Sequence, residues 1–353
     1  MQPIHRRGFL RYAGATAVSA AAASSISVVR AGILGTQHSH VRGKLSAMKN
    51  SPDYQVVAAC EPNAQARVKN GADPLFQGVR WVSEEELLGD PSIHLIVVEC
   101  RVWEALPWGK KVIAAGKHLH LEKPPGNEWA PFKELVEEAR RKKLLFQTGY
   151  MYRDHAGMTA AIEAARSGWL GEVYLVRATI NSDRTPQGRD IEARYRGGSL
   201  FELGGHMIDR VVELLGRPSK VNSWLRHDTG FNDKLADNTL AVLEYDKALA
   251  LVSSAARMHG AGEHRSFEVI GADGNIMVQP AESSRPMMRV SLRKAHGPYR
   301  AGAQEIELPA QPRFIGDFKE LAHALKTGQP LKLSYDHELT LHETLLRASG
   351  ELS

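Results

Sequence analysis

The chain has 353 residues, of which 43% are hydrophobic and 24% are charged. This composition suits a soluble protein with two modest cores, so two domains are expected. The net charge is +5, and three arginines before residue 28 contribute +3 of it, because that segment contains no acidic residue. The remaining net charge of about +2 gives no reason to expect a nucleic-acid partner.

Residues 1–27 resemble a twin-arginine export signal. Arg6 and Arg7 are followed by Phe9-Leu10 and an alanine-rich stretch. The pattern predicts export to the periplasm or another extracytoplasmic compartment, with cleavage near Ala23. The alternative is a disordered or helical extension. No later segment approaches the ~18 uncharged apolar residues that span a bilayer, so no membrane span is expected after the signal is removed.

Residues 28–150 alternate apolar strands with helical stretches. This order predicts an α/β domain with a Rossmann-type, doubly wound parallel sheet. Ligands of such a sheet bind in the crevice beyond the carboxyl ends of its strands. The expected strands are residues 28–34, 54–60, 93–98, 117–121 and 144–149.

The pattern changes beyond residue 150, where the strands lengthen and alternate. Residues 151–353 are therefore expected to form an α+β domain on one large, mostly antiparallel sheet, which would bind substrate and mediate oligomerisation. A polar loop at 181–196 is a candidate lid. The main strands are expected at 173–180, 239–245, 248–255 and 267–278.

Glu122, Lys123 and Pro124 directly follow the strand expected at 117–121. This position places the acid and the lysine in the crevice at the strand ends. Pro124 and Pro125 cannot continue the strand and stiffen the backbone that presents Lys123. The segment predicts a catalytic lysine; the alternative is an ordinary pair of loop charges.

Several segments together resemble the Gfo/Idh/MocA family, named for glucose-fructose oxidoreductase and inositol dehydrogenase. The likeness covers nearly everything after residue 28. Its first element is the Glu-Lys-Pro motif, and the others follow in the order usual for the family. They are GYMYR at 149–153, SGWLGEVYLVRA at 167–178, GGSLFELGGHMID at 197–209, VIGADGNIMV at 269–278 and FIGDFKELAHALKTGQPL at 314–331.

The dinucleotide turn departs from the family, because the expected G-x-G-x-x-G reads Gly35-Thr36-Gln37-His38-Ser39-His40. Only the first glycine is present. Either the turn still presents backbone N–H groups to a cofactor, with Gln37 and His38 adding donors, or the site is degraded. Glu61 follows the second strand and is expected to accept the ribose hydroxyls, which favours NAD over NADP. The alternative for Glu61 is a surface acid that opens the next helix.

A second departure occurs at Cys100 and Arg101, where relatives usually have a threonine-proline turn near the nicotinamide. By resemblance, these two residues, Glu122, Lys123 and Pro124 complete the cofactor-binding set. Cys60 and Cys100 each end a strand and are expected to be free thiols that pack as small hydrophobes.

Glu202, His206 and Asp209 lie at i, i+4 and i+7 of a helix expected from about Gly198, so they would share one face. A solvated helix face is the alternative. Gly204 and Gly205 inside that helix indicate that something approaches its backbone.

The resemblance makes His206 the catalytic histidine, with Glu202 where the family usually has aspartate. Lys123 or His206 would take the hydroxyl proton, and Glu202 would orient His206. Candidates for holding sugar hydroxyls are Tyr152, Arg153, Tyr195, Arg196 and Asp209.

Histidine pairs at 38 and 40 and at 118 and 120 raise the question of a metal site, since H-x-H pairs in strands project to one side. Each pair lies in a segment that the nucleotide fold already explains, and no acid or cysteine completes a set at metal-ligand spacing. We therefore expect no metal.

The resemblance implies an NAD(P)-dependent oxidoreductase that transfers hydride at a secondary hydroxyl of a sugar, polyol or glycoside, and that forms homo-oligomers. Free NAD is scarce outside the cytoplasm, so an exported enzyme is expected to hold its cofactor tightly. Two alternatives stay open: an NAD-using lyase or glycosidase that acts by transient oxidation and elimination, and a non-catalytic sugar-binding protein on the same scaffold.

Overall fold

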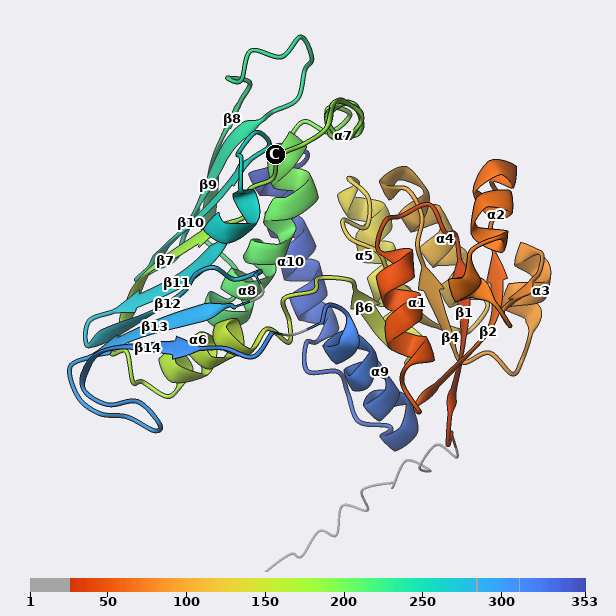
Figure 1. Ribbon diagram of the computed structural model, residues 1–353, viewed down its shortest axis with the longest axis horizontal. Helices are drawn as coiled ribbons and strands as arrows, with labels where there is room; N and C mark the ends of the chain where they lie inside the picture. The colour runs from red at the N-terminus through yellow and green to blue at the C-terminus, as the bar shows by residue number, and fades with distance from the viewer. Residues whose placement is uncertain (1–25, 284, 311) are drawn as a thin grey trace, which may run out of the picture.

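The computed structural model describes residues 26–283, 285–310 and 312–353. The twin-arginine pattern lies in residues 1–25, outside the described residues. Two sheets face each other across a layer of helices (Figure 1). Within the described part of the chain, no helix combines the length and the apolar character that crossing a membrane requires.

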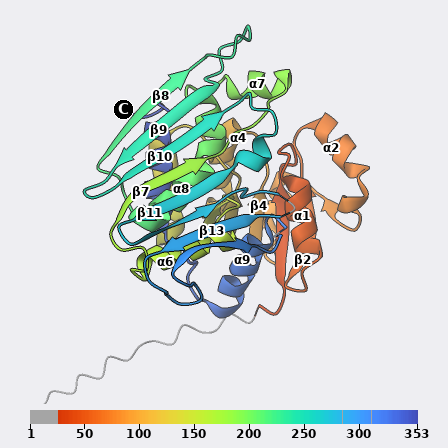
Figure 2. The ribbon, with the colours of Figure 1, turned by 60° about the vertical axis from the view of Figure 1, so that its left-hand side comes forward.

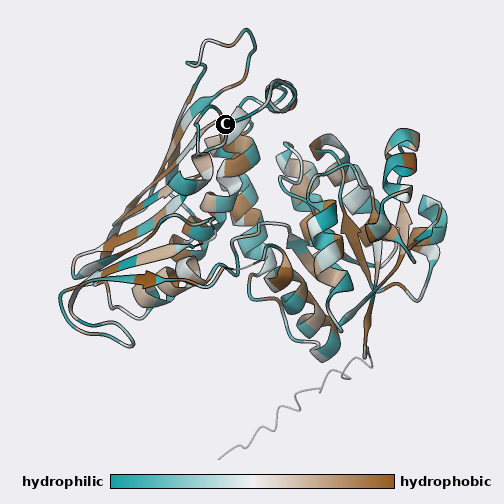
Figure 3. Cartoon of the chain, in the orientation of Figure 1, coloured by the Kyte–Doolittle hydropathy of each residue, from teal (hydrophilic) through white to brown (hydrophobic). Residues whose placement is uncertain are grey.

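The first sheet is parallel and has the strand order β3-β2-β1-β4-β5-β6, as expected for a doubly wound domain. Helices cover both of its faces, which is why β1 and β4 are buried almost throughout and apolar along their length (Figure 3). Its strands are β1 (Val29–Leu34), β2 (Tyr54–Cys60), β3 (Arg80–Trp81), β4 (Leu95–Val98), β5 (His118–Leu121) and β6 (Phe146–Thr148). Its helices are α1 (Val41–Lys49), α2 (Ala64–Gly71), η1 (Pro74–Phe76), α3 (Glu84–Gly89), α4 (Val102–Ala114) and α5 (Trp129–Arg141).

The second sheet has eight strands in the order β14-β13-β12-β11-β7-β10-β9-β8, and only the β7–β10 pair is parallel. Its strands are β7 (Val173–Thr179), β8 (Lys220–Arg226), β9 (Asn238–Glu244), β10 (Leu249–Ala255), β11 (Ser266–Gly271), β12 (Gly274–Val278), β13 (Met287–Leu292) and β14 (Gly302–Glu307). Burial alternates along β9, β10 and β11, which indicates one covered face.

Three helices cover the inner face of the second sheet: α6 (Ala156–Arg166), α8 (Gly205–Leu215) and α10 (Tyr335–Ala348). None of the described helices covers the outer face (Figure 2). Trp224 and Leu249, which the strand pairing places on that face, are about half exposed. The outer face thus carries apolar side chains that no described helix of this chain covers (Figure 2).

Helix α9 (Ile315–Thr327) packs against the first domain, whereas the sequence analysis assigned it to the second. Phe318, Leu321 and Leu325 on this helix pack with Leu45 and Met48 of α1 in one buried cluster of the first domain. The sequence analysis assigned residues 314–331 to the second domain by their place in the chain, but chain order carries no information about which core receives an apolar helix face.

The loop at 181–196, expected to be a free lid, contains α7 (Pro186–Glu192). Arg189 on α7 is almost fully buried and donates to Asp233 and Asp237 at 2.6 and 2.8 Å. The loop is therefore anchored to the second domain by a buried ion pair.

A buried ion network is linked to the first domain by Thr148 at the end of β6, whose backbone N–H and hydroxyl donate to Glu338 at 3.2 and 2.5 Å. Arg153, which follows β6, donates to Glu338 of α10 at 2.6 Å and to Asp209 of α8 at 2.9 Å. The Asp209 carboxylate also accepts from Arg210 and contacts His337 at 2.9 Å. Arg153 and Asp209 were expected to hold sugar hydroxyls, but both are buried and their polar groups are used inside this network.

Replacing Arg153 with alanine would leave Glu338 and part of Asp209 as uncompensated buried charges. We expect the free energy of unfolding to fall by roughly 3 kcal/mol, as measured by urea denaturation. Arg196→Ala is the matched control, because the exposed Arg196 donates only to the carbonyl of Gly350 at its guanidinium, and it should change stability by less than about 0.5 kcal/mol. An unchanged stability of Arg153→Ala would show that the network is not structural.

His342 of α10 packs on Phe132 of α5, with ring centroids 4.0 Å apart, and neither ring nitrogen has a partner among the described residues. Burial lowers the pKa of His342 to about 3. In the unfolded chain His342 is protonated below about pH 6.5, whereas in the folded protein it stays neutral down to about pH 3. Proton uptake therefore favours the unfolded chain, so the contribution of His342 to the free energy of unfolding is fully present above about pH 6.5 and is lost as the pH falls towards 3.

The variant His342→Leu removes this proton uptake. Between pH 7.5 and pH 5.0, wild-type stability should fall by about 2 kcal/mol more than that of the variant, as measured by urea unfolding at both values. The same substitution at the exposed His323 should not alter the pH dependence. Equal losses in wild type and His342→Leu would contradict the assignment.

Candidate active site between the two domains

Lys123 lies at the carboxyl end of β5, as the motif predicted, and its side chain is only 2% exposed. Its ammonium group donates to the carboxylate of Glu202 at 2.8 Å and to the carbonyl of Glu202 at 3.1 Å. Glu202 belongs to the second domain. The lysine therefore reaches across the crevice that the strand order predicts as the ligand site.

The segment that carries Glu202 is a π-helical turn, η2 (Leu200–Gly204), and α8 begins only at Gly205. The expected regular helix from Gly198 is wrong on this point. A π-turn widens the helix by one residue, so the i, i+4 relation between Glu202 and His206 does not hold. Glu202 pairs with Lys123, and no interaction orients His206 through this carboxylate. Gly205 is approached closely as predicted: a Cβ atom there would stand 2.7 Å from the ring of Tyr150.

His206 is 1% exposed and lies between two tyrosine rings, with centroids 5.4 Å from Tyr150 and 5.5 Å from Tyr152. Its Nδ1 has no hydrogen-bond partner among the described residues. Burial, and then the positive charge of Lys123, hold the pKa of His206 well below its usual range. The ring is neutral at pH 7, which is the form that accepts a proton.

The turn after β1 keeps the first glycine of the fingerprint for a steric reason. Gly35 has φ +82°, and a Cβ atom there would lie 2.5 Å from Trp108 and 2.9 Å from the carbonyl oxygen of Glu99. Beyond it, the N–H groups of Gln37 and His38 donate to that same carbonyl at 3.1 and 3.4 Å. Backbone donors that usually cradle a diphosphate are thus turned inwards.

Glu61 lies at the end of β2, where a ribose-binding acid is expected, and it is 7% exposed. One of its oxygens accepts from the backbone and hydroxyl of Thr36 at 2.6 and 2.7 Å, and the other accepts from the backbone of Asn63 at 2.8 Å. The tight turn at Gly35 and the fixed carboxylate of Glu61 lie close together, so these residues fit the nucleoside end of a dinucleotide. The diphosphate end differs from the usual cradle.

A buried ionic cluster lies beside this turn, and the sequence analysis missed its central residue. Lys44 of α1 is 1% exposed and donates to Glu99, at the end of β4, at 2.5 Å, and to Glu122, at the end of β5. His40 Nδ1 lies 3.1 Å from Oε1 of Glu122, and His38 Nδ1 lies 3.5 Å from Oε2. We expected no acid to complete the H-x-H pair at 38 and 40, and this premise was wrong.

The charges within the cluster follow from burial and proximity. Burial alone would lower the pKa of Lys44, but the carboxylates of Glu122 and Glu99 raise it above its usual value. Burial opposes ionisation of Glu122, yet His38, Lys44 and His40 hold its pKa well below the usual range. Burial raises the pKa of Glu99. Burial also lowers the pKa of both His38 and His40.

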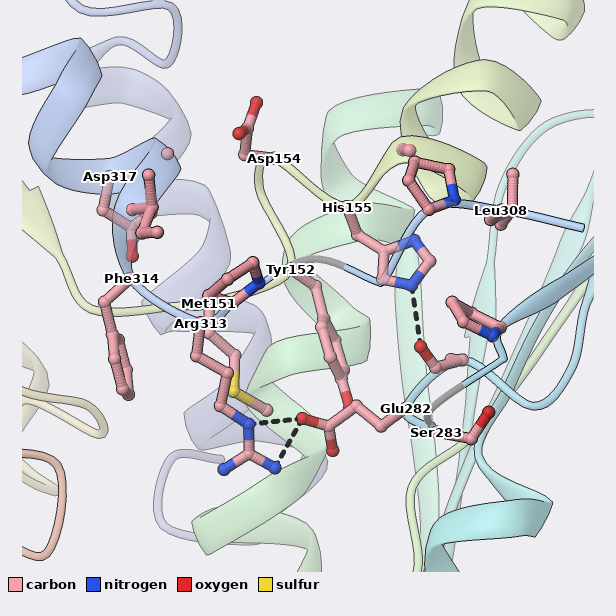
Figure 4. A pocket seen from close by; sticks show the side chains of 17 residues that line it. Met151, Tyr152, Asp154, His155, Glu282, Ser283, Leu308, Arg313, Phe314 and Asp317 are labelled. Carbon is pink, nitrogen blue, oxygen red and sulfur yellow. Dashed lines mark hydrogen bonds and ion pairs between the residues drawn. The ribbon is translucent and has the colours of Figure 1, made fainter. Parts of the chain in front are cut away.

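A cavity of about 380 Å³ opens next to Tyr152, between the residues that follow β6, the β12–β13 connection and the segment before α9 (Figure 4). This volume lies within the range of small-molecule sites. Arg313 donates to Glu282 across it at 2.6 Å, and His155 Nε2 contacts the carbonyl of Ala281 at 2.8 Å. Burial raises the pKa of Asp317, also in its wall, to about 7.

The remaining expected residues lie at different places. Tyr152 lines the cavity as a substrate-binding residue would. Tyr195 is buried against Phe201, and Arg196 is bound to the C-terminal segment through Gly350 and Glu351. The peptide bond between Lys123 and Pro124 is cis.

Cys60 and Cys100 are buried free thiols. Burial raises the pKa of Cys60 to about 11 and that of Cys100 further. Arg101 precedes α4, where its backbone N–H donates to Glu104 at 3.0 Å.

Relatives of known activity include a reductase and a dehydrogenase. A dTDP-3,4-didehydro-2,6-dideoxy-alpha-D-glucose 3-reductase of Streptomyces violaceoruber is 24% identical over 317 residues, which cover 86% of each chain. A trans-1,2-dihydrobenzene-1,2-diol dehydrogenase of Mus musculus is 27% identical over 216 residues, which cover 59% of this chain and 62% of the mouse enzyme.

Solved structures share the fold. A 3-ketoreductase of Actinomadura kijaniata, solved with NADP and TDP-benzene, has a TM-score of 0.73 at 20% identity and covers 91% of this chain and 96% of its own. The structure of the probable oxidoreductase yhhX has the same TM-score at 22% identity, with the same coverage.

Two family models match the chain, one for each domain. Residues 29–150 match the oxidoreductase family with an NAD-binding Rossmann fold, and residues 158–277 match the GFO/IDH/MocA C-terminal domain. Both carry the description that the sequence motifs suggested, and together they span most of the chain. The chain belongs to the Gfo/Idh/MocA family of oxidoreductases.

Proposed function

We propose that the protein transfers hydride between bound NAD and a secondary hydroxyl of a sugar, polyol or glycoside. The observation that carries this proposal is the pairing of Lys123 with Glu202 across the crevice, next to a buried and neutral His206. A hydrogen-bond donor at the end of β5 and a neutral imidazole on α8 of the facing domain suit the oxidation of an alcohol. The Streptomyces relative acts on a sugar nucleotide, which supports a carbohydrate substrate.

Each residue has a distinct part in this proposal. The cofactor, when bound, accepts or returns the hydride. Lys123 holds the substrate oxygen by donating a hydrogen bond, and His206 takes the hydroxyl proton on a ring nitrogen. Glu202 fixes the ammonium group of Lys123 from the opposite domain. The cavity lined by Tyr152, Glu282 and Arg313 supplies donors and acceptors for further hydroxyls.

NAD is the proposed cofactor in preference to NADP. The buried carboxylate of Glu61 would repel a 2′-phosphate on the ribose, whereas it accepts hydrogen bonds from ribose hydroxyls. Thr36 and Asn63 hold this carboxylate in place. The related 3-ketoreductase structure contains NADP. The proposed preference for NAD therefore rests on Glu61 of this chain and not on that relative.

A sugar-binding role without redox chemistry is the second candidate. It is favoured by the inward-turned N–H groups of Gln37 and His38, which weaken the usual diphosphate cradle.

We also propose that the protein is exported by the twin-arginine route. We propose further that it forms a homo-oligomer through the outer face of the second sheet, where Trp224 and Leu249 are exposed.

The first test is to purify the folded protein, denature it and identify by mass spectrometry any nucleotide that it releases. We expect NAD close to one equivalent per chain, because an exported enzyme must carry its cofactor. Stoichiometric NAD that is unchanged after turnover would also permit the lyase or glycosidase mechanism. Protein without nucleotide that also fails to bind added NAD or NADP would overturn the oxidoreductase assignment in favour of sugar binding.

Lys123→Ala should lower kcat by about 10²–10⁴-fold while the protein stays folded, because Lys123 acts on the substrate oxygen. The assay is absorbance at 340 nm, or product analysis by mass spectrometry where the cofactor is not released, with a panel of sugars, polyols and glycosides. Lys110→Ala, at an exposed lysine of the same domain, is the control. Full activity of Lys123→Ala would remove the lysine from the mechanism.

A further inference from the structure

The structure assigns a mononuclear transition-metal site to His38, His40 and Glu122. One ligand atom from each of these residues lies within 4.8 Å of the other two. Metal–ligand bonds of about 2.1 Å separate neighbouring ligands of a tetrahedral ion by roughly 3.4 Å, so only a small adjustment of the side chains is needed. Two imidazoles and one carboxylate form a set typical of zinc and of non-haem iron.

The fold brings the three side chains together for a topological reason. His38 and His40 lie in the turn between β1 and α1, and Glu122 follows β5. Strands β1 and β5 are both paired with β4, so their carboxyl ends lie two strands apart at the same edge of the sheet. The two histidines occupy the part of the turn where the fingerprint has lost its second and third glycines. At these positions imidazole side chains replace the bare backbone of a glycine-rich turn and are available as ligands.

The surroundings of the three ligands are those of a metal centre. Glu99 is fully buried, and its Oε2 has no hydrogen-bond partner among the described residues. This oxygen lies 3.9 Å from His38 Nδ1, beyond hydrogen-bond distance, so within the described part of the chain it is an unpaired buried acceptor beside the three ligands. Lys44 fixes the carboxylates of both Glu99 and Glu122.

The ligand chemistry selects the class of ion. Imidazole nitrogen suits Zn²⁺, Fe²⁺ and related divalent ions, whereas Mg²⁺ and Ca²⁺ prefer oxygen ligands throughout. Three protein ligands leave at least one coordination position open, as in catalytic sites. The ring of His40 contacts Phe314, which lines the cavity of Figure 4, with centroids 5.1 Å apart. An open position at this place takes an oxygen ligand from the crevice.

The test is titration of chelator-treated, dialysed protein with ZnCl₂ by isothermal titration calorimetry at pH 7.5, with visible absorption of Co²⁺ as a second probe. We expect one tight equivalent per chain and the absorption bands of low-coordinate Co²⁺. His38→Gln and His40→Gln should each remove tight binding. His323→Gln, at an exposed histidine of α9, is the matched control and should bind as wild type.

Thermal melts in EDTA and in Zn²⁺ distinguish ligand loss from misfolding. Zn²⁺ should raise the Tm of wild type and of His323→Gln, and leave that of His38→Gln and His40→Gln unchanged. Wild-type protein that takes up no Zn²⁺, or uptake that persists when both histidines are replaced, would overturn the site and leave the cluster as hydrogen-bonded packing. Neither readout involves a nucleotide or a sugar, so the result is independent of the proposed function.

Discussion

The geometry of the crevice depends on the ion pairs that the buried ammonium group of Lys44 makes. This group extends from α1 to the ends of β4 and β5, where it meets Glu99 and Glu122. Two carboxylates without it would repel each other in a region where neither is accessible to water. Because Glu122 immediately precedes Lys123, the position of the candidate catalytic lysine is coupled to this contact. The first domain therefore presents Lys123 from a rigid base.

The second domain completes the site with a local departure from regular helix. The π-helical turn at Leu200–Gly204 directs Glu202 towards Lys123, while His206 remains buried between Tyr150 and Tyr152. A regular α-helix would place both polar side chains on one face, as the residue spacing suggested. π-Turns are frequent at functional sites, and here the turn separates Glu202, the partner of Lys123, from His206.

Local patterns were sufficient to predict most of the fold. Apolar runs and alternation located most strands of both sheets but missed β3, β8, β13 and β14, and the expected strand at 267–278 is the hairpin of β11 and β12. The Glu-Lys-Pro segment located Lys123 at a strand end. The sequence could not reveal Lys44, because a lysine on an amphipathic helix normally lies in water and its two partners are 55 and 78 residues away. A recognisable signal did exist in Glu99, an acid that directly follows the fully buried strand β4.

The roles of Arg153 and Asp209 were mistaken for a related reason. Each is a charged residue near the family's motifs, and polarity alone favoured a place at the surface of a sugar site. Their burial depends on Glu338, which lies 185 residues after Arg153, and only the assembled fold brings the three together. Partner choice among distant charges is a property of the tertiary structure that no local pattern encodes.

The return of α9 to the first domain means that the polypeptide crosses between the domains three times: after β6, before α9, and between α9 and α10, which covers the second sheet. The first two crossings contribute walls to the cavity of about 380 Å³. A rotation of one domain against the other must bend these crossings together, and it changes the shape of the space between them. Any molecule that fits this cavity better at one interdomain angle will shift the population of angles towards that value. Ligand binding in the cavity is thus coupled to the closure of the crevice.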